Sequence, residues 1–160
     1  HLWSERRGLF EALHDGQPVD VTPLFNLLPL ATGRLPPELV ERLLANLTDP
    51  GAFWTAYPLA TVSLRDDKFD PQQMWRGPSW MNINYLFIEA LYRVGQPDLA
   101  RRLRRETLAL IQRHPDIYEY YNPITGDHPP KAAPIFGWTS AVFIDLALQE
   151  TRERASGTLE

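Results

Sequence analysis

The sequence contains no cysteine, which excludes a disulfide framework and a zinc site built on thiolates. It also has no run of 18 apolar residues, so we expect no segment that crosses a bilayer and no membrane partner. The excess of acidic residues is small, 20 against 16 Lys and Arg. A net charge of −4 gives no reason to expect nucleic acid as a partner. The absence of cysteine is typical of cytoplasmic proteins, and we expect that location.

Histidine is scarce as well, with four residues at positions 1, 14, 114 and 128. No two of them have the i, i+4 spacing that places two imidazoles on one face of a helix to bind a metal ion. The sequence also lacks a glycine loop that could bind phosphate and the turn that presents a nucleophilic serine. We therefore expect no metal ion and no cofactor.

What the chain does have is apolar and aromatic material, since 44% of its 160 residues are hydrophobic. This is enough for the core of one domain spanning residues 1–160. Apolar residues recur at helical spacing in several segments, whereas no series of strands is evident, although short strand pairs could lie in the long loops. We expect an ordered helical region over 1–151 and a polar tail over 152–160. The expected helices are a short buried one at 23–31, a second that follows Pro36-Pro37 and has apolar positions from Leu39 to Leu47, and then 80–94, 97–113 and 139–149.

Buried and amphipathic helices alternate along the chain. The segment 80–94 is apolar on nearly every side, which predicts burial on both faces. In the next segment Ala100, Leu103, Leu110 and Ile111 face inward, while Arg101, Arg102, Arg104, Arg105 and Gln112 are expected to face water. Such alternation is typical of nested helical hairpins in which outer helices cover inner ones. The chain supplies about half of the helices that a closed barrel of this all-α type needs.

Two long loops, 65–80 and 117–138, concentrate aromatic, glycine, proline and charged residues. Loops of this length in a compact domain are usually functional or disordered, and these are too aromatic for disorder. In the second loop Glu119 is flanked by Tyr118 and Tyr120. Poor solvation among aromatic rings favours proton uptake by a carboxylate, as a general base requires. The alternative, equally weighted from the residues alone, is that Glu119 accepts backbone hydrogen bonds and fixes the loop.

Other polar residues have two interpretations each. Arg76 could donate paired hydrogen bonds to sugar hydroxyls or a carboxylate, or it could pair with Asp66, Asp67 or Asp70 and order the loop. The second interpretation is slightly favoured. Asn82 and Asn84 need partners if they are buried, as ligand contacts or as loop anchors. Asp145 is expected to be a satisfied buried carboxylate rather than a catalytic one.

Several motifs occur together in a recognisable order. Residues 74–80 (MWRGPSW) are followed by Asn84-Tyr85, then residues 118–123 (YEYYNP) by Thr125-Gly126, and then residues 136–140 (FGWTS). Residues 3–5, 8–10, 26–30 and 53–54 add further similarity. This series resembles glycoside hydrolase family 63, and most of all its bacterial branch of mannosylglycerate and glucosylglycerate hydrolases.

The resemblance implies an (α/α)6 barrel that hydrolyses a glycosidic bond with inversion. It assigns the general base to Glu119. It also implies a sugar pocket lined by the WRGP loop and nearby aromatic residues, namely Trp75, Arg76, Gly77, Trp80, Tyr85, Tyr120 and Trp138. The general acid of the family is an aspartate in an N-terminal segment that this sequence does not contain. We therefore expect the C-terminal part of a catalytic domain, inactive by itself.

The leading hypothesis is a fragment of an enzyme that hydrolyses a small α-glycoside such as mannosylglycerate, glucosylglycerate or a gluco-oligosaccharide. Its expected partners are that substrate and either the N-terminal half of the barrel or another copy of the chain. The alternative is a non-catalytic sugar-binding or scaffold module. A sugar epimerase on the same barrel is a third possibility, but no histidine is well placed for its acid–base chemistry.

Overall fold

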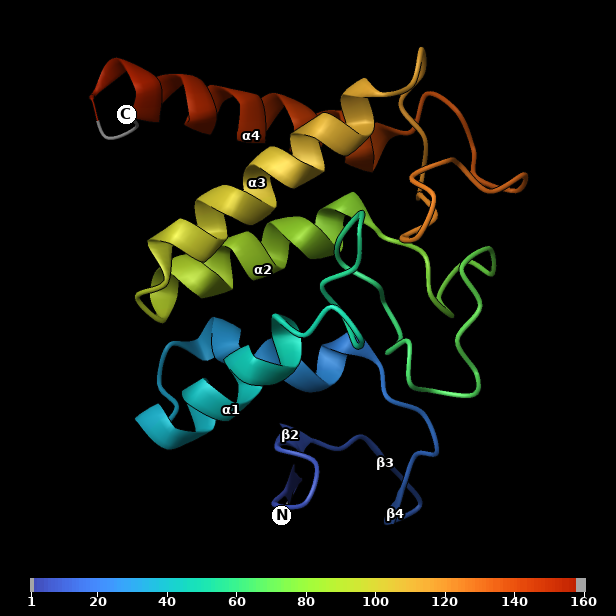
Figure 1. Cartoon of the computed structure of the whole chain (residues 1–160), viewed down its shortest axis with the longest axis vertical. Helices are drawn as coiled ribbons and strands as arrows, with labels where there is room; N and C mark the ends of the chain where they lie inside the picture. Colours follow the sequence, from blue (N-terminus) through green and yellow to red (C-terminus); the bar gives the residue numbers. More distant parts are fainter. Residues whose placement is uncertain (1, 158–160) are drawn as a thin grey trace.

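The computed structural model describes residues 2–157, and its regular structure is mostly helical (Figure 1). A 3-10 helix, η1 (Leu24–Thr32), is followed by α1 (Pro37–Leu47), α2 (Met81–Arg93), α3 (Pro97–Gln112) and α4 (Gly137–Ala155). Two antiparallel hairpins precede them: β1 (Trp3–Ser4) pairs with β2 (Leu9–Phe10), and β3 (Leu13–His14) pairs with β4 (Gln17–Pro18). These short strand pairs lie near the N-terminus and not in the two long loops.

The helix ends follow local rules of backbone chemistry. Both α1 and α3 have a proline at their first residue, where its fixed φ suits a helix and its missing N–H is not needed. Gly33 ends η1 with a φ of 63°, a left-handed conformation that glycine adopts without steric cost. In the part of the chain that the structure describes, no helix is long and apolar enough to span a membrane.

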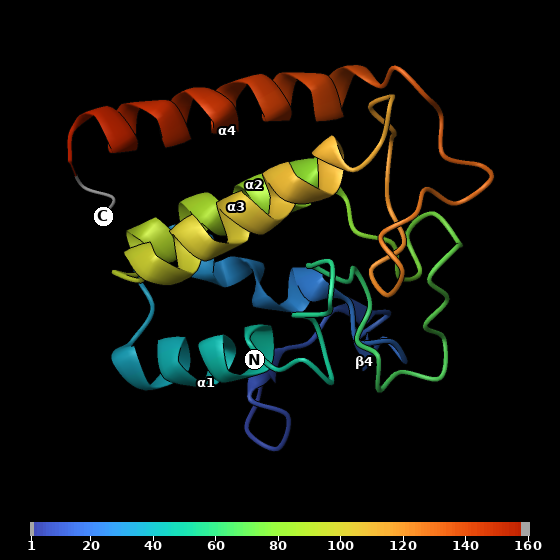
Figure 2. The same ribbon diagram turned by 45° about the horizontal axis from the view of Figure 1, so that its top comes forward.

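The helices form hairpins around α2. Helix α1 returns antiparallel to η1, and α3 returns antiparallel to α2, while η1, α2 and α4 all begin at the same end of the molecule (Figure 1). Helix α2 contacts η1, α3 and α4 and is therefore central. The long connections 48–80 and 113–136 lie together at the end where α2 and α4 begin (Figure 2).

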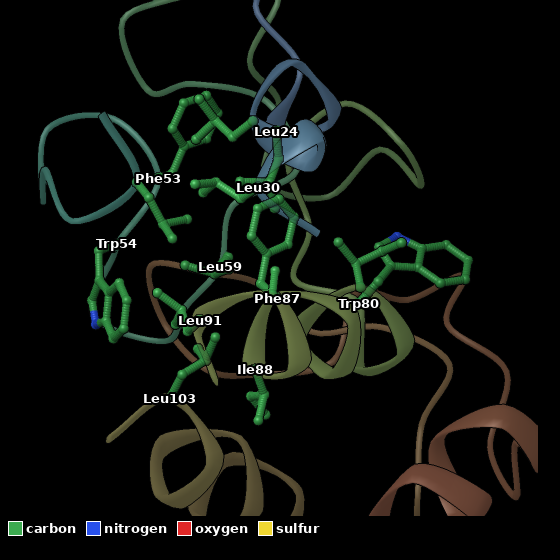
Figure 3. Packing of buried hydrophobic residues seen from close by; sticks show 14 of the residues in the cluster. Leu24, Leu30, Phe53, Trp54, Leu59, Trp80, Phe87, Ile88, Leu91 and Leu103 are labelled. Atoms are coloured by element: carbon green, nitrogen blue, oxygen red, sulfur yellow. The ribbon is translucent and has the colours of Figure 1, made fainter. Parts of the chain in front are cut away.

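Helix α2 is buried on two faces, as its apolar pattern predicted. On one side Phe87 points toward Leu24 and Leu30 of η1, and on the other Ile88 points toward Leu103 of α3 (Figure 3). All five side chains are fully buried. Burial of a side chain of this size is worth about 1.5–3 kcal/mol, so α2 holds η1 and α3 together. The same packing fixes the position of the first residues of α2 in the fold.

Arg104 was expected to face water, and this prediction is wrong. Its side chain on α3 is fully buried, and Nε donates to Glu150 of α4 at 2.9 Å. The Nη atoms bind Glu153 at 2.6 and 3.0 Å and the Tyr92 hydroxyl at 3.2 Å. An arginine can be buried in this way because both acceptors carry negative charge.

The same contacts explain why the C-terminal helix is longer than predicted. Helix α4 continues to Ala155, so neither a helix end near residue 149 nor a polar tail starting at 152 matches the structure. Glu150 and Glu153 lie in its last turns and are held by Arg104, which stabilises residues that are polar in composition. Residues 158–160 of the predicted tail lie outside the described residues.

Candidate active site

A backbone bridge joins the two aromatic loops. The N–H of Ser79 donates to the Tyr121 carbonyl at 2.8 Å, and the N–H of Tyr121 donates to the Ser79 carbonyl at 3.0 Å. Ser79 lies two residues before the first residue of α2. The WRGP segment and the segment around Glu119, which are far apart in the sequence, therefore meet at the N-terminal end of α2.

Gly77 occupies a position that no other residue fits. A Cβ atom added to it would lie 2.5 Å from the carbonyl oxygen of Asp70, which belongs to the backbone and cannot move aside easily. On either side of this contact the loop is closed by backbone hydrogen bonds, from Asp70 N–H to the Arg76 carbonyl at 2.8 Å and from Thr61 N–H to the Gly77 carbonyl at 3.1 Å. Gly77 thus permits the tight turn that carries Trp75 and Arg76.

Asn84 is a loop anchor. Its fully buried carboxamide donates to the Pro58 carbonyl at 2.7 Å and to the Thr107 hydroxyl at 3.0 Å, and it accepts the Leu59 N–H at 3.0 Å. The Ser79 hydroxyl also donates to the Pro58 carbonyl, at 2.7 Å. Of the two roles considered for a buried Asn84, anchoring of a loop accounts for the contacts with Pro58 and Leu59, while the bond to Thr107 joins α2 to α3.

Four aromatic rings form a ladder that runs from the surface to the buried Tyr120, the residue after Glu119. Trp75 stacks on Trp80 with ring centroids 3.9 Å apart and planes inclined by 7°, and Trp80 lies 5.0 Å from the ring of Tyr120. Trp75 is 43% exposed, whereas Trp80 and Tyr120 are buried. Phe25 of η1 extends the ladder, 6.3 Å from Trp75. Sequence reasoning missed Phe25 because no local motif connects it with the loops.

Arg76 does not pair with an aspartate in the part of the chain that the structure describes, contrary to the interpretation favoured above. Its exposed side chain donates from Nε to the Lys68 carbonyl at 3.1 Å. Asp66, one of the expected partners, instead accepts the backbone N–H groups of Thr22 and Lys68 at 2.6 and 2.9 Å. Arg76 therefore helps to order the loop through a carbonyl, and its charged terminus faces solvent.

Glu119 is held by its backbone. Its N–H donates to the Ala133 carbonyl at 2.9 Å, and its carbonyl accepts the hydroxyl of Thr139 at 3.4 Å. Thr139 lies in the first turn of α4, so Glu119 is placed near the beginnings of both α2 and α4. Partial positive charge at helix N-termini favours an anion at this end of the molecule.

The half-buried carboxylate of Glu119 forms no ion pair and no hydrogen bond with any residue from 2 to 157. The alternative in which this carboxylate fixes the loop by accepting backbone hydrogen bonds thus finds no contact among those residues. Other groups fix the loop instead. Asn122 Oδ1 accepts the Thr125 N–H at 3.2 Å, and the Gly126 carbonyl contacts His114 Nε2 at 2.8 Å.

The remaining predicted site residues differ in how accessible they are. Tyr85 donates its hydroxyl to the carboxylate of Asp145, a hydrogen bond that is the main cause of a raised pKa for Tyr85. Asp145 also accepts Gln149 Nε2 at 2.8 Å, so its carboxylate is satisfied, as expected, but it is half-buried rather than buried. Trp138 is 58% exposed at the start of α4, and its ring meets Phe136 edge-on at 5.9 Å.

Tyr120 is completely buried, and its hydroxyl has no hydrogen-bond partner within residues 2–157. Burial, and secondarily the negative charge of Glu119, raises the pKa of Tyr120. No group of three or more histidine, aspartate and glutamate side chains in that same range could hold a metal ion. The site described so far is thus one carboxylate beside an aromatic ladder and an exposed arginine.

Comparisons with known proteins identify the family of this chain. Residues 1–139 match the family described as the mannosylglycerate hydrolase MGH1-like glycoside hydrolase domain. The chain belongs to this family. It is 33% identical over 153 residues to mannosylglycerate hydrolase of Thermus thermophilus, covering 94% of this chain and 35% of that protein. It is also 33% identical over 124 residues to glucosylglycerate hydrolase of Mycolicibacterium hassiacum, covering 73% of this chain and 26% of that one.

Solved structures in this glycoside hydrolase family share the fold. A family 63 mannosylglycerate hydrolase from Thermus thermophilus, solved with Tris and D-glycerate, superposes with a TM-score of 0.80 at 29% identity. The match covers 89% of this chain and 34% of that one. Such solved relatives are (α/α)-barrel enzymes. The chain spans about a third of the length of the mannosylglycerate hydrolases from Thermus thermophilus and Rubrobacter radiotolerans.

Proposed function

We propose that this chain is part of an inverting glycoside hydrolase in which Glu119 is the general base. The observation that carries the proposal is a carboxylate without a hydrogen-bond or ion-pair partner among residues 2–157, fixed by its backbone where α2 and α4 begin and adjacent in sequence to Tyr120 of the aromatic ladder. Sugars offer apolar C–H faces that stack on aromatic rings, while their hydroxyls bind charged groups. The proposed substrate is a small α-glycoside such as mannosylglycerate, glucosylglycerate or a gluco-oligosaccharide.

In the proposed reaction Glu119 removes a proton from a water molecule. That water attacks the anomeric carbon from the face opposite the leaving group, while a second carboxyl group protonates the leaving oxygen. In inverting enzymes the two carboxyl groups stand about 6.5–9.5 Å apart, which leaves room for the water. We assign no aspartate of loop 65–80 to the acid role, and Asp66 is already engaged by two backbone N–H groups. We propose that the acid comes from sequence outside these 160 residues.

Seven residues are proposed to line the sugar pocket. Trp75 offers the exposed face of the aromatic ladder for stacking, and the free end of Arg76 can bind vicinal hydroxyls or the carboxylate of a glycerate group. Gly77 contributes through the tight turn that presents Trp75 and Arg76. The others are Trp80, Tyr85, Tyr120 and Trp138.

We further propose that the chain forms about half of an (α/α)6 barrel. Helices η1, α2 and α4 are the inner helices, whereas α1 and α3 are outer ones. An inner helix should be apolar on two sides, and α4 supports this arrangement. Its packed side is apolar, and on the other side Ile144 is 60% and Leu148 48% exposed. We propose that the N-terminal half of the barrel, or another copy of the chain, covers these exposed side chains of α4. The proposed location of the enzyme is the cytoplasm.

The test is hydrolysis by a protein expressed with the coding sequence that precedes His1. Mannosylglycerate and glucosylglycerate are supplied, and proton NMR identifies the anomer of the sugar released first. Because water attacks opposite the leaving group, an α-glycoside should yield the β anomer before mutarotation. Release of the α anomer first contradicts the inverting mechanism, and no release from either compound or from gluco-oligosaccharides contradicts the proposed activity.

The exposed outer end of the ladder also favours a second candidate function, a non-catalytic sugar-binding module. A ring such as Trp75, 43% exposed and rigidly backed by Trp80, can stack on a sugar without any acid or base. This candidate predicts that mannosylglycerate changes the tryptophan fluorescence of the 160-residue chain, and that the longer protein hydrolyses none of the glycosides. Hydrolysis by the longer protein would exclude it.

A further inference from the structure

The hydroxyl of Tyr120 is buried but has no hydrogen-bond partner in the described part of the chain. Among residues 2–157 only one other buried side-chain oxygen or nitrogen, the hydroxyl of Thr55, is in that condition. A buried donor without an acceptor loses its hydrogen bonds to water and gains none in return, so native proteins rarely leave one unpaired. We therefore look for an acceptor that a neighbouring side chain of this chain can bring to the hydroxyl of Tyr120 by rotating about its own bonds.

The ring of Tyr120 cannot move far to find one. It stacks on Trp80 at 5.0 Å, and the other face of Trp80 is covered by Trp75 at 3.9 Å. The backbone is fixed on both sides, by the hydrogen bond from Glu119 N–H to Ala133 and by the bridge between Tyr121 and Ser79. The acceptor has to come to the phenol rather than the reverse.

The adjacent carboxylate of Glu119 has the freedom that Tyr120 lacks. It is half-buried, sits on a side chain with three rotatable bonds, and forms no hydrogen bond or ion pair with residues 2–157. Its negative charge already acts on the Tyr120 phenol. Burial and this charge raise the pKa of Tyr120, so the phenol keeps its proton at neutral pH and remains a donor.

We propose that Tyr120 is a positioning residue whose hydroxyl donates a hydrogen bond to one carboxylate oxygen of Glu119. Hydrogen bonds to an ionised acceptor are shorter and stronger than those between neutral groups. This bond holds the side chain of Glu119 in one orientation and leaves its second oxygen to accept a proton from water. That Tyr120 assists turnover rests on the proposed function, whereas the hydrogen bond between Tyr120 and Glu119 does not.

The contact is tested on the 160-residue chain by NMR of labelled tyrosine, with Tyr120→Phe identifying the Tyr120 hydroxyl signal. We expect exchange of this hydroxyl proton with water to be slower in the parent chain than in Glu119→Ala, by about tenfold, because the acceptor holds the proton. Glu119→Gln keeps the shape of the side chain but is a neutral acceptor, so the proton signal should move upfield. Tyr118→Phe and Asp127→Asn are matched controls that should change neither quantity.

Equal exchange rates in the parent chain and Glu119→Ala would overturn the proposal, as would an unchanged signal in Glu119→Gln. If Glu119→Ala does not fold, the shift in Glu119→Gln decides alone. In the longer, active protein Tyr120→Phe should lower kcat about tenfold and leave KM nearly unchanged, because phenylalanine keeps the ring that Tyr120 contributes to the proposed pocket and removes only the hydroxyl that positions the base. If substitution of Glu119 changes the Tyr120 hydroxyl signal but the longer protein hydrolyses no glycoside, the proposed function is refuted and the hydrogen bond between the two residues still holds.

Discussion

Replacing Arg104 by methionine should destabilise the chain strongly. Methionine preserves an unbranched stem but removes the charge that faces two carboxylates. Glu150 and Glu153 have side chains only 10% and 24% exposed, so they would remain poorly solvated after losing the buried cation. Glu150 would keep its ion pair with the exposed Arg154, and Glu153 would keep the hydrogen bond from the Tyr92 hydroxyl. Removing one partner of a buried ion pair in this way typically costs about 3–5 kcal/mol, and we expect a loss of unfolding free energy in that range.

The network also makes stability depend on pH in a defined direction. The hydrogen bond from Arg104 is the main cause that lowers the pKa of Glu153 from 4.5 to about 2. A carboxyl group with a depressed folded-state pKa stabilises the fold fully above its unfolded value of 4.5, and this contribution is lost as the pH falls toward 2. The parent chain should therefore lose more stability between pH 4.5 and 2 than the Arg104→Met variant does.

Urea unfolding followed by circular dichroism at pH 7 and at several acidic pH values measures both effects. Arg102→Met is the matched control. Arg102 lies on the same helix and pairs with Glu106, but its side chain is 56% exposed, so its loss should cost under about 1 kcal/mol. Equal destabilisation by the two substitutions, or the same acid dependence in the parent chain and Arg104→Met, would refute the reasoning.

Three further substitutions test the loops and the core by the same unfolding measurement. Gly77→Ala should cost at least about 2 kcal/mol, because its Cβ would meet the Asp70 carbonyl at 2.5 Å; a neutral effect would show that the turn can relax. Phe87→Ala should cost about 3–5 kcal/mol through the cavity it leaves, and a loss below about 1 kcal/mol would argue against a central α2. Trp75→Ala should cost only about 1 kcal/mol and shift tryptophan emission to longer wavelength as Trp80 meets water, so unchanged emission would contradict the stack.

The sequence was most informative where structure depends on local pattern. Two apolar faces on segment 80–94 predicted burial on both sides of α2, and Phe87 and Ile88 confirm it. Helix ends predicted from the positions of prolines and glycines mostly lie within two residues of the ends in the structure. Local composition also located both aromatic loops and the WRGP turn, because packing of a core does not require so many glycine, proline and tryptophan residues close together.

What the sequence did not predict depends on distant partners. Arg104 stands in a run of arginines that indicates a solvated helix face, and only the fold brings Glu150 and Glu153 onto it. The length of α4 was underestimated for the same reason. In the candidate site, the exposed position of Arg76 and the ladder contact of Phe25 with Trp75 likewise depend on tertiary packing.

The central claim is that Glu119 is the base of a glycoside hydrolase. Its most direct test is the turnover number of Glu119→Gln against that of the unmodified protein, each expressed with the sequence that precedes His1. Asp127→Asn, an exposed carboxylate in the same loop, is the control. The account predicts a loss of about 10²–10⁴-fold for Glu119→Gln, the usual contribution of a general base, and an unchanged rate for Asp127→Asn. Full activity in Glu119→Gln would contradict the account.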